Sequence, residues 1–471
     1  MNTGARRDTI AAIATPPGSG GIGVVRVSGP EALHLLQQVF QPRRAVPAFV
    51  SHHLYYGHIR AQNGSLLDEV LAVYMQAPHS YTCEDVVELQ CHAAPVVLQE
   101  LLARLATLGA RPAEPGEFTK RAFLAGRIDL SQAEALIDLL TARTAAGAEL
   151  AAAQLHGALA AAIGGIRQSL IELLAHIEVA IDFPDEDAEL VDRKEAARRL
   201  RAEVLAPVQA LIADAGYARL YREGARLVIA GLPNAGKSSL LNALLREERA
   251  LVTAVPGTTR DSIEEGMNLG GIPVQVIDTA GIRPAAACSD AVEVLGVERA
   301  RQMLLSADAL LLLIDAEAGL TPALRALYAE LADRAQILLV LNKRDLLQAA
   351  EEQHLCAAAA AMAPGRPLVS ISAKNGEGLQ ELQDALLALI APAADSFGRS
   401  ARLAPNRRHH AVLMRVEAAC TQCLAALEAG APVDLLSVDM QSILETIGEI
   451  SGETSPDEVL DAVFSRFCIG K

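Results

Sequence analysis

The chain has 471 residues, of which 51% are hydrophobic and 3% are aromatic, and it contains no tryptophan. This length predicts roughly three domains, and so aliphatic and alanine-rich a composition favours helices. The formal net charge of −16 at pH 7 argues against a protein that coats nucleic acid by bulk electrostatics, but a local basic patch is compatible with it.

The first 120 residues mix short apolar strands with helical runs. Strands are predicted at Thr9–Ala14, Ile22–Val27, Leu71–Met75 and Asp85–Gln90. Pro16 and Pro17 interrupt the first apolar segment, so we expect no signal peptide. No apolar run approaches the roughly 18 residues that span a bilayer, so no membrane anchor is expected. We interpret residues 1–120 as one α/β or α+β domain.

The chain becomes helical near residue 120. Ser131-Gln-Ala-Glu134 has the pattern of a capping box, and it predicts one alanine-rich helix to about residue 162. Two further helices follow, and the last helix is predicted to begin with Ser455 as its N-cap. Because helical sequence returns only after about residue 405, we infer one helical bundle in two pieces, 121–222 and 391–471. A nucleotide-binding module, 223–390, is inserted between them.

The strongest motif is the glycine loop Gly231-Leu-Pro-Asn-Ala-Gly-Lys-Ser-Ser239. It follows an apolar run, Leu227–Ala230, and opens a helical segment, which is the context of a phosphate-binding loop. Its backbone N–H groups and the helix N-terminus favour a polyphosphate. Lys237 can reach the β and γ phosphates, and the Ser238 hydroxyl suits Mg²⁺.

Four further motifs follow this loop in order. Pro256–Asp261 offers a second hydroxyl for Mg²⁺, and a strand delivers Asp278-Thr-Ala-Gly281, where the Gly281 N–H can meet a γ phosphate. A strand is predicted at 309–314, and strands at 337–341 and 368–371 then deliver Asn342-Lys-Arg-Asp345 and Ser372-Ala-Lys374. The Asp345 carboxylate fits the two N–H donors on guanine's Watson–Crick edge. We therefore predict a doubly wound fold that binds GTP at the carboxyl ends of its strands.

The order of these motifs resembles the translation-factor class of GTPases. Ile282 stands where Ras-like GTPases place a water-orienting glutamine, so another group is expected to position water. The side-chain oxygen of Asn234 can hold a monovalent cation that offsets charge on the phosphates. The alternative is that Asn234 only stabilises the loop turn.

Segments at both ends of the chain resemble a known family. Residues 8–29, 81–92, 115–124 and the terminal Cys468-Ile-Gly-Lys471 match the MnmE (TrmE) family of tRNA-modification GTPases. The resemblance implies an N-terminal domain that binds folate and dimerises, a discontinuous helical domain and an inserted GTPase domain. It also implies a homodimer that works with tRNA and with MnmG, an FAD-containing partner. The seven scattered cysteines favour reduced thiols and a cytoplasmic protein.

The family's reaction follows from the same resemblance. The two proteins would install an aminomethyl or carboxymethylaminomethyl group on C5 of the tRNA wobble uridine. The carbon would come from a tetrahydrofolate derivative (5-formyl or 5,10-methylene), and the nitrogen from ammonium or glycine. GTP hydrolysis would be stimulated by potassium and would drive a conformational change.

Matched positions carry the family's site residues onto this chain. Folate falls to Arg26, Glu88, Arg127 and Lys471, K⁺ to Asn234, Thr253, Val255 and Thr258, and Mg²⁺ to Ser238 and Thr259. Glu293 aligns with the residue that positions water, and it joins Lys237 and Gly281 as the catalytic set. The implied GTP contacts are Asn234, Ala235, Gly236, Lys237, Ser238, Ser239, Thr253, Ala254, Val255, Pro256, Gly257, Thr258, Thr259, Asp278, Thr279, Ala280, Gly281, Asn342, Lys343, Asp345, Ser372, Ala373 and Lys374.

Two questions about cysteines stay open. Cys468 has either a role in the folate chemistry or none beyond that of an inert thiol. Cys420 and Cys423 invite a zinc interpretation, but a lone C-x-x-C in helical sequence favours ordinary thiols. The competing hypothesis for the whole chain is a GTPase that acts only as a switch, for example on ribosomes. It predicts an added RNA-binding domain or a basic tail, and the sequence suggests neither.

Overall fold

The computed structural model describes residues 8–18, 20–182, 192–247, 265–278, 307–332, 336–392 and 403–470. The chain divides into two compact units. The first comprises Met1–Ile137, Ala160–Ile171 and Val438–Lys471, and the second comprises Asp138–Leu159 and Glu172–Ser437. Each unit combines segments that lie far apart in the sequence.

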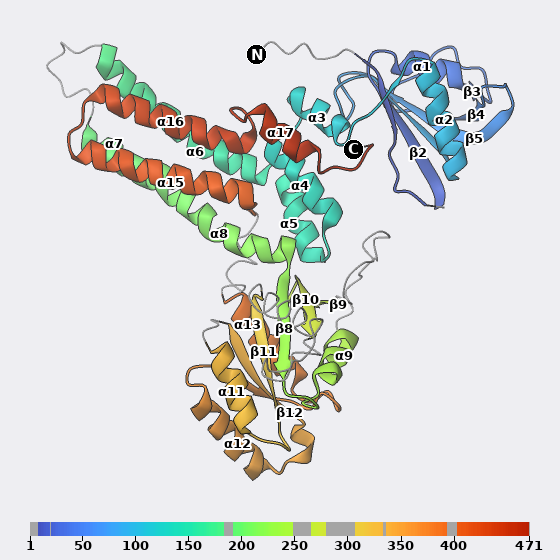
Figure 1. The fold of residues 1–471 in the computed structure, drawn as a ribbon. Coiled ribbons are helices and arrows are strands. Elements are labelled where there is room, and N and C mark those ends of the chain that lie inside the picture. Colours follow the sequence, from blue (N-terminus) through green and yellow to red (C-terminus); the bar gives the residue numbers. More distant parts are fainter. Residues whose placement is uncertain are drawn as a thin grey trace, which may run out of the picture. The chain divides into compact units, whose positions relative to one another are not determined.

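The first unit is built on a seven-stranded sheet (Figure 1). Its spatial order is β3-β4-β5-β6-β2-β1-β7, and all neighbours pair antiparallel except β1 and β7, which pair in parallel. The strands are β1 (Ile10–Ile13), β2 (Gly20–Ser28), β3 (Phe40–Pro42), β4 (Leu54–Arg60), β5 (Leu66–Met75), β6 (Val86–Ala93) and β7 (Arg111–Pro112). The four strands predicted in this region are confirmed, and β3, β4 and β7 are additional.

Helices pack on this sheet and beside it. Helices α1 (Ala32–Val39) and α2 (Pro95–Thr107) bury Leu36 and Leu101 against strand side chains such as Val25 and Leu89. A second apolar cluster joins α4 (Leu130–Thr141) to the C-terminal helix α17 (Asp457–Phe464) through Leu130 and Phe464. Helix α3 (Glu117–Leu124) contributes Phe118 to a third, small cluster beneath β1. The C-terminal helix is thus part of the core of the N-terminal region.

The alanine-rich sequence does not form the single helix that was predicted. Helix α4 ends at Thr141, α5 covers Ala145–Leu155, and α6 begins at Ala158. Thr144 caps α5 by accepting a hydrogen bond from the Gly147 N–H, and Gly157 has a φ of 88°, which ends that turn. Both features favour a break because a side-chain cap and a left-handed residue compete with continued helix.

Two predicted caps are also wrong. Asp129, not Ser131, caps α4: its Oδ1 accepts the Gln132 N–H at 2.8 Å, while Gln132 Oε1 accepts the Asp129 N–H at 3.0 Å. The capping box therefore lies two residues earlier than predicted. Ser455 donates to the Glu449 carbonyl and does not cap α17.

The second unit contains helices and a six-stranded sheet. The sheet order is β13-β12-β11-β8-β10-β9, parallel throughout except for the β9–β10 hairpin. The strands are β8 (Ala225–Gly231), β9 (Glu265–Leu269), β10 (Ile272–Asp278), β11 (Ala309–Asp315), β12 (Ile337–Asn342) and β13 (Leu368–Ser370). The strands predicted at β8, β10, β11, β12 and β13 are confirmed.

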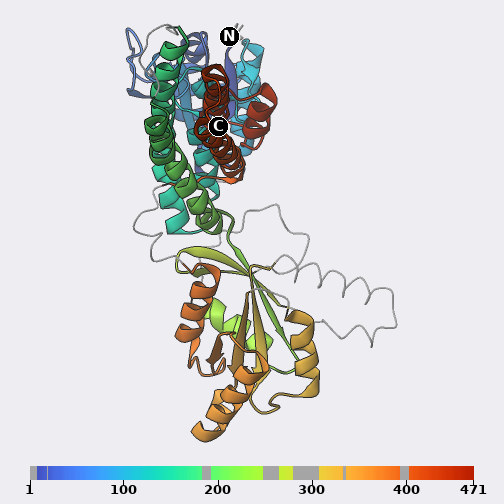
Figure 2. The same ribbon diagram turned by 90° about the vertical axis from the view of Figure 1, so that its left-hand side faces the viewer.

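Helices cover both faces of this sheet (Figure 2). Helices α9 (Lys237–Glu247) and α13 (Leu379–Ile390) pack against one face, on which Leu311 and Val340 lie. Helices α11 (Pro322–Leu331) and α12 (Ala349–Met362) pack against the other face. Continuous apolar strands such as β11 are buried on both sides, as expected for a doubly wound parallel sheet.

The remaining helices lie on either side of this module in the sequence. They are α6 (Ala158–Asp182), α7 (Arg193–Arg199), the π-helical segment η1 (Leu200–Leu205), α8 (Ala206–Glu223), α15 (Arg407–Glu428) and α16 (Val433–Ser451). Helix α15 packs along α7, η1 and α8, so chain from before and after the sheet module forms one helical layer. The expectation that no apolar run approaches 18 residues is wrong for α6, whose segment Ala158–Val179 is long and apolar enough to cross a membrane. One such helix is weak evidence for a membrane span, because the core helix of a soluble protein passes the same test.

Candidate functional site

The phosphate loop lies between β8, which ends at Gly231, and α9, which begins at Lys237. Asn234 has a φ of 65° and Gly236 a φ of 91°, so the loop twice enters the left-handed region. Asparagine tolerates that region better than most residues. Lys237 Nζ donates to the carbonyl oxygens of Gly231 at 3.0 Å and Leu232 at 3.1 Å. The lysine therefore lies over its own loop, at the carboxyl end of β8.

Asn342 joins this loop to another. Its side chain is buried at the end of β12 and donates through Nδ2 to the Ala235 carbonyl at 2.9 Å. Its Oδ1 accepts the Ala373 N–H at 3.1 Å. One amide thus uses a donor and an acceptor to hold the phosphate loop beside the Ser372–Lys374 loop. A Cβ at Gly236 would lie 2.3 Å from Asn342 Nδ2, so only glycine fits this approach.

Asp345 lies next to the same two loops. Its Oδ1 accepts a hydrogen bond from Ser372 Oγ at 2.6 Å, and Ser372 Oγ accepts the Asn375 N–H at 3.2 Å. Lys343 has a φ of 69°, and its Nζ lies 2.7 Å from Asp315 Oδ2 at the end of β11. The structure therefore brings together the carboxyl ends of β8, β11, β12 and β13, with an exposed carboxylate at Asp345.

Several predicted residues lie outside the described part of the chain. For Asp278 only the backbone is described, at the end of β10 and paired in register with Ile229. The others are Thr253, Ala254, Val255, Pro256, Gly257, Thr258, Thr259, Thr279, Ala280, Gly281, Glu293 and Lys471. Their roles stay predictions.

A second polar cluster lies on the sheet of the first unit. Arg26 on β2 and Glu88 on β6 are directly opposite in the antiparallel register. Arg26 Nε donates to Glu88 Oε1 at 2.8 Å, and both side chains are about one fifth exposed. Arg26 Nη1 also donates to the Gly470 carbonyl at 3.2 Å, so the C-terminal residues approach this pair.

Tyr81 connects this pair to Arg127. The guanidinium of Arg127 lies 4.9 Å from the centre of the Tyr81 ring, and that of Arg26 lies 5.9 Å from it. Arg127 Nη1 donates to the Tyr81 carbonyl at 3.0 Å. Burial raises the pKa of the Tyr81 phenol, whose oxygen is 3.0 Å from Thr119 Oγ1, so this ring stays neutral at physiological pH. The aromatic ring thus lies beside two residues that the sequence named separately, Arg26 and Arg127.

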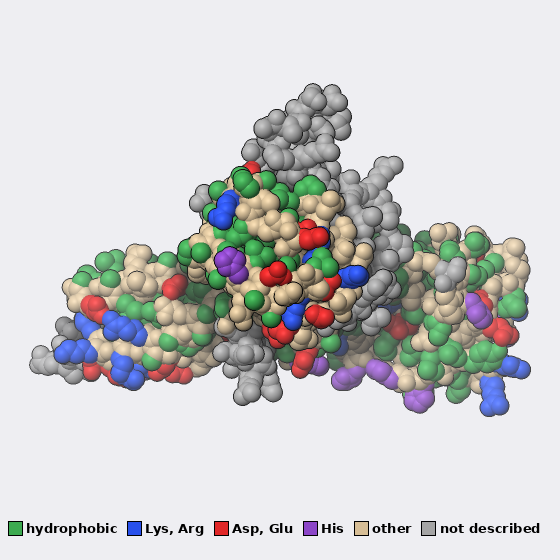
Figure 3. All heavy atoms as spheres, turned by 90° about the horizontal axis from the view of Figure 1, so that it is seen from below, with side chains coloured by type: hydrophobic (Ala, Val, Ile, Leu, Met, Phe, Trp, Pro, Cys, Tyr) green, Lys and Arg blue, Asp and Glu red, His purple; other side chains and the backbone are tan. Residues whose placement is uncertain are grey.

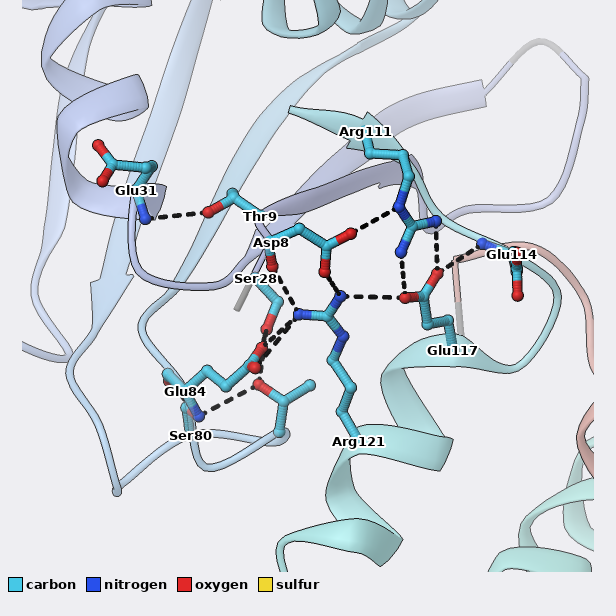
Figure 4. Close-up of polar contacts among 11 residues, drawn as sticks. Asp8, Thr9, Ser28, Glu31, Ser80, Glu84, Arg111, Glu114, Glu117 and Arg121 are labelled. Atoms are coloured by element: carbon cyan, nitrogen blue, oxygen red, sulfur yellow. Dashed lines mark hydrogen bonds and ion pairs between the residues drawn. The ribbon is translucent and has the colours of Figure 1, made fainter. Parts of the chain in front are cut away.

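An ion-pair network fixes the frame behind this cluster (Figure 4). Arg121 on α3 contacts Asp8, Glu84 and Glu117, and Arg111 on β7 contacts Asp8 and Glu117. Burial raises the pKa of Glu117, but hydrogen bonds from Arg111, the Glu114 N–H and Arg121 outweigh it, so its pKa is lowered. The network ties the start of the chain to the loop before β6 and to α3.

The two cysteines of the C-x-x-C motif lie in the core, on one helix. Cys420 and Cys423 are fully buried in α15, and burial raises the pKa of the Cys420 thiol to about 12. No group of three or more metal-binding side chains occurs among the described residues. Cys468 is exposed near the C-terminus. For Cys420 and Cys423, ordinary core thiols are the interpretation that the burial supports.

Charges are mixed on the face of the sheet module that is turned to the viewer in Figure 3. Acidic, basic and apolar side chains are interspersed there. Nucleic-acid phosphates are held by clustered lysine and arginine. The described residues on this face do not form a block of positive charge of that kind.

Comparisons with known proteins identify the family to which this chain is similar. The MnmE helical domain matches residues 130–468, and the TrmE N-terminal domain matches residues 9–127. A tRNA modification GTPase MnmE from Desulfotalea psychrophila is 47% identical over 99% of both chains. The chain belongs to the MnmE family. A member from Symbiobacterium thermophilum is 47% identical over 98% of this chain and 99% of its own.

One similar solved structure covers a smaller part of the chain than the MnmE relatives do. Era from Aquifex aeolicus, bound to GDP and AlF₄⁻, is 31% identical over 35% of this chain and 56% of its own, with a TM-score of 0.30. The family relatives, in contrast, cover this chain almost from end to end.

Sequence reasoning missed three residues of the two clusters. Tyr81 and Phe118 lie against Arg26, and Asp315 pairs with Lys343. Tyr81 begins the segment 81–92 that resembles the MnmE family, and Asp315 ends a buried strand. Both positions therefore gave a weak indication in the sequence that they belong to a site. Phe118 lies in residues 115–124, which also carried the resemblance, but its place under Arg26 depends on how α3 packs beneath β1.

Proposed function

We propose that this chain hydrolyses GTP to GDP and phosphate as part of tRNA modification. The observation that carries the proposal is the Asn342 amide, which joins the phosphate loop to the Ser372–Lys374 loop beside Asp345. This arrangement supports a purine nucleotide with its phosphates at Lys237 and its base at Asp345. A carboxylate accepts both N–H groups of guanine, whereas adenine does not present that pair.

The chain's own residues divide the work on the phosphates. Lys237 would neutralise charge on the β and γ phosphates, and Gly281 would donate its N–H to the γ phosphate. Glu293 would orient the attacking water, in the place that Ile282 cannot fill. Ser238 stands in the first turn of α9, where a hydroxyl suits Mg²⁺, and Thr259 would complete that site. Mg²⁺ would supply charge neutralisation.

Potassium is the cation that we propose at the phosphate loop. Asn234 lies in the middle of the loop, where its backbone adopts the left-handed conformation and its side chain is exposed. An exposed side-chain oxygen at this position supports binding of a cation beside the phosphates. Thr253, Val255 and Thr258 would complete the site. K⁺ would supply positive charge where Ras-like GTPases use an arginine. Replacing K⁺ by Na⁺ should lower turnover, and equal rates would remove this part of the proposal.

A reduced folate is the ligand that we propose for the Arg26–Glu88–Arg127 cluster. The Glu88 carboxylate matches the donor edge of a pterin, and the arginines match a carboxylate-bearing tail. Lys471 would join them beside Gly470. Dimerisation through this N-terminal domain is part of the same proposal. An FAD-containing partner and tRNA would complete the assembly.

Nucleotide selectivity tests the central proposal. Asp345→Asn replaces an acceptor by an amide that donates, so it should lose affinity for GTP by about a hundredfold, the value of two charge-assisted hydrogen bonds. The same variant should gain affinity for xanthosine triphosphate, whose base carries an oxygen in place of the amino group. Asp384→Asn, on the exposed side of α13, is the matched control and should behave as the unchanged chain.

Two further measurements test the wider role. The full chain should bind 5-formyltetrahydrofolate, and Glu88→Gln should weaken that binding about tenfold, because a charge-assisted hydrogen bond becomes a neutral one. Deleting the gene should leave tRNA wobble uridines unmodified at C5. Equal binding of ATP and GTP, or no binding of reduced folate, would contradict the proposal.

A further inference from the structure

The carboxyl ends of β11 and β12 place two charged side chains against each other. The strands are parallel neighbours, and Asp315, the last residue of β11, lies opposite Asn342, the last residue of β12. Lys343 follows Asn342 directly, and its Nζ donates to Asp315 Oδ2 at 2.7 Å. The pairing continues beyond β11, because the Ala316 N–H donates to the Asn342 carbonyl at 3.0 Å. The strand register therefore brings this carboxylate and this ammonium together.

The Asp315 carboxylate is fixed at both of its oxygens. Oδ2 binds Lys343, and Oδ1 accepts the Glu317 N–H at 3.0 Å. The Gly319 N–H donates to the Asp315 carbonyl at 2.9 Å, so the turn after β11 closes on the same residue. The side chain of Asp315 is 15% exposed and that of Lys343 is 28% exposed. A pair with this little exposure, and with one partner tied to the backbone, keeps its geometry better than an exposed ion pair does.

Lys343 needs such support because its backbone conformation is unusual. Its φ of 69° lies in the left-handed region, which is unfavourable for a residue with a Cβ. The Leu346 N–H donates to the Lys343 carbonyl at 3.0 Å, and the Arg344 N–H donates to the Ile371 carbonyl at 3.0 Å. These bonds fix the backbone, and Asp315 fixes the ammonium. The lysine side chain is thus held at both of its ends.

Lys343 stands between the two contacts that are proposed to hold the ends of the nucleotide. Asn342, the residue before it, binds the phosphate loop at the Ala235 carbonyl, and Asp345, two residues after it, is proposed to accept the guanine N–H groups. A nucleotide that spans these contacts crosses residue 343. The methylene groups of a lysine can cover an apolar surface while the ammonium keeps a polar partner. The face of a purine ring is such a surface.

We propose that Asp315 is a positioning residue of the nucleotide site, which holds the Lys343 ammonium so that the lysine stem forms a fixed support for the purine ring. The proposal rests on the GTP site proposed above and adds to it a residue that does not touch the nucleotide. Asp345 would select guanine through its N–H groups. The Asp315–Lys343 pair would instead contribute equally to GTP and GDP, because both carry the same base.

The opposite end of β11 offers a matched control. Asp308 directly precedes the strand, accepts the Arg226 N–H at 2.9 Å and pairs with Arg219 at 2.7 Å. Like Asp315, it therefore holds one backbone N–H and one cationic side chain. It lies at the amino end of the strand, whereas the nucleotide is expected at the carboxyl ends. Asp308→Ala should lower stability to a similar extent and leave nucleotide binding unchanged.

The test is calorimetric titration of the full chain with GDP, together with steady-state GTP hydrolysis. Asp315→Ala should weaken GDP binding about tenfold, the value of one hydrogen bond to a charged group. It should raise KM for GTP by a similar factor and leave kcat unchanged, since binding is lost equally in the ground state and the transition state. Asp315→Asn keeps an oxygen that can accept from Lys343, so it should recover part of the lost affinity. Thermal unfolding establishes that each variant is folded.

Lys343→Met separates positioning of the lysine from general support of the fold. Methionine keeps an unbranched apolar side chain but removes the ammonium, so Asp315 has no cation to hold. In this background Asp315→Ala should cause no further loss of GDP affinity. A second loss of about tenfold in the Lys343→Met background would overturn the proposal, because Asp315 would then act independently of the lysine.

The remaining outcomes separate the positioning role from the nucleotide site itself. GDP affinity that is unchanged in Asp315→Ala, or lowered equally in Asp308→Ala, overturns the positioning role and leaves the GTP site standing. A fall in kcat at unchanged KM also contradicts the role, because the pair would then act in the chemical step. No binding of GDP or GTP to the unchanged chain overturns both proposals.

Discussion

Asn342 and Ala235, 107 residues apart in the sequence, are joined by a hydrogen bond of 2.9 Å from the amide Nδ2 to the carbonyl oxygen. The same amide accepts the Ala373 N–H. Since Asn342 is only 2% exposed, water cannot replace either bond easily. The conformation of the phosphate loop is therefore coupled to the loop that is proposed to surround the base.

Removing this amide should affect both stability and nucleotide binding. Asn342→Ala leaves the buried Ala235 carbonyl and the half-buried Ala373 N–H without partners, which should lower the free energy of unfolding by about 2 kcal/mol. It should also weaken GTP binding, because the phosphate loop loses its tie to the base loop. Asn406→Ala, which removes the cap of α15, is the control. It should destabilise by about 1 kcal/mol with GTP affinity unchanged, and an equal loss of GTP affinity in both variants would show a general effect of unfolding.

The Tyr81 ring should matter more to ligand binding than its hydroxyl. Tyr81→Phe loses the contact with Thr119 but keeps the ring between Arg26 and Arg127. Tyr81→Ala removes the surface on which both guanidinium groups lie, so both should become more mobile. Equilibrium binding of 5-formyltetrahydrofolate should fall about tenfold for Tyr81→Ala, since cation–π contacts contribute ~0.5–1 kcal/mol each. Tyr81→Phe should bind nearly as the unchanged chain, and a larger loss for Tyr81→Phe would contradict this role for the ring.

The network of Figure 4 predicts an acid-sensitive fold. Glu117 has a pKa below its ordinary value of 4.5 in the folded chain, so its contribution to stability is fully present above that pH. The contribution is lost as the pH falls through the lowered folded value, because the unfolded chain then binds the proton more readily. As the pH is lowered from about 5 to about 3, the free energy of unfolding of the unchanged chain should fall. Denaturant unfolding at several pH values in this window measures it.

Glu117→Gln isolates this effect. The amide does not titrate, so the dependence of unfolding free energy on pH should become shallower, although the variant is less stable at neutral pH. Glu195→Gln is the control, because Glu195 forms an exposed pair with Arg198 that solvent screens. If both variants changed the slope equally, burial of the network would not be the source of the acid sensitivity.

Arg222 ties together three parts of the second unit. Its Nε lies 2.7 Å from Asp138 Oδ2, and its Nη2 donates to the Ala404 carbonyl at 2.6 Å. Both charged side chains are 17% exposed. Breaking such a pair on one side strands a charge, so Arg222→Ala should destabilise by about 3 kcal/mol. A double-mutant cycle with Asp138→Ala should recover part of that loss, and strictly additive losses would mean that the pair carries no coupling.

Some features of this protein are set by the sequence alone. The phosphate loop, the buried strands β11 and β12 and the guanine-type motif at 342–345 were recognisable because each depends on a short run of residues. Apolar runs of five or six residues between polar turns allow few conformations other than a buried strand. The order of the motifs along the chain then predicted the doubly wound sheet, which the structure confirms.

Only the tertiary structure decided which distant side chains meet. Arg26 faces Glu88 because the β2–β6 register is fixed by burial of one face, and a shift of one residue in either strand would turn that strand's side chain to the opposite face. Arg167 and Glu453, 286 residues apart, line one cavity because α6 and the end of α16 pack together. The periodicity of apolar residues in the sequence predicts which face of a helix or strand is apolar. Which other helix or strand packs against that face depends on the packing of the whole unit.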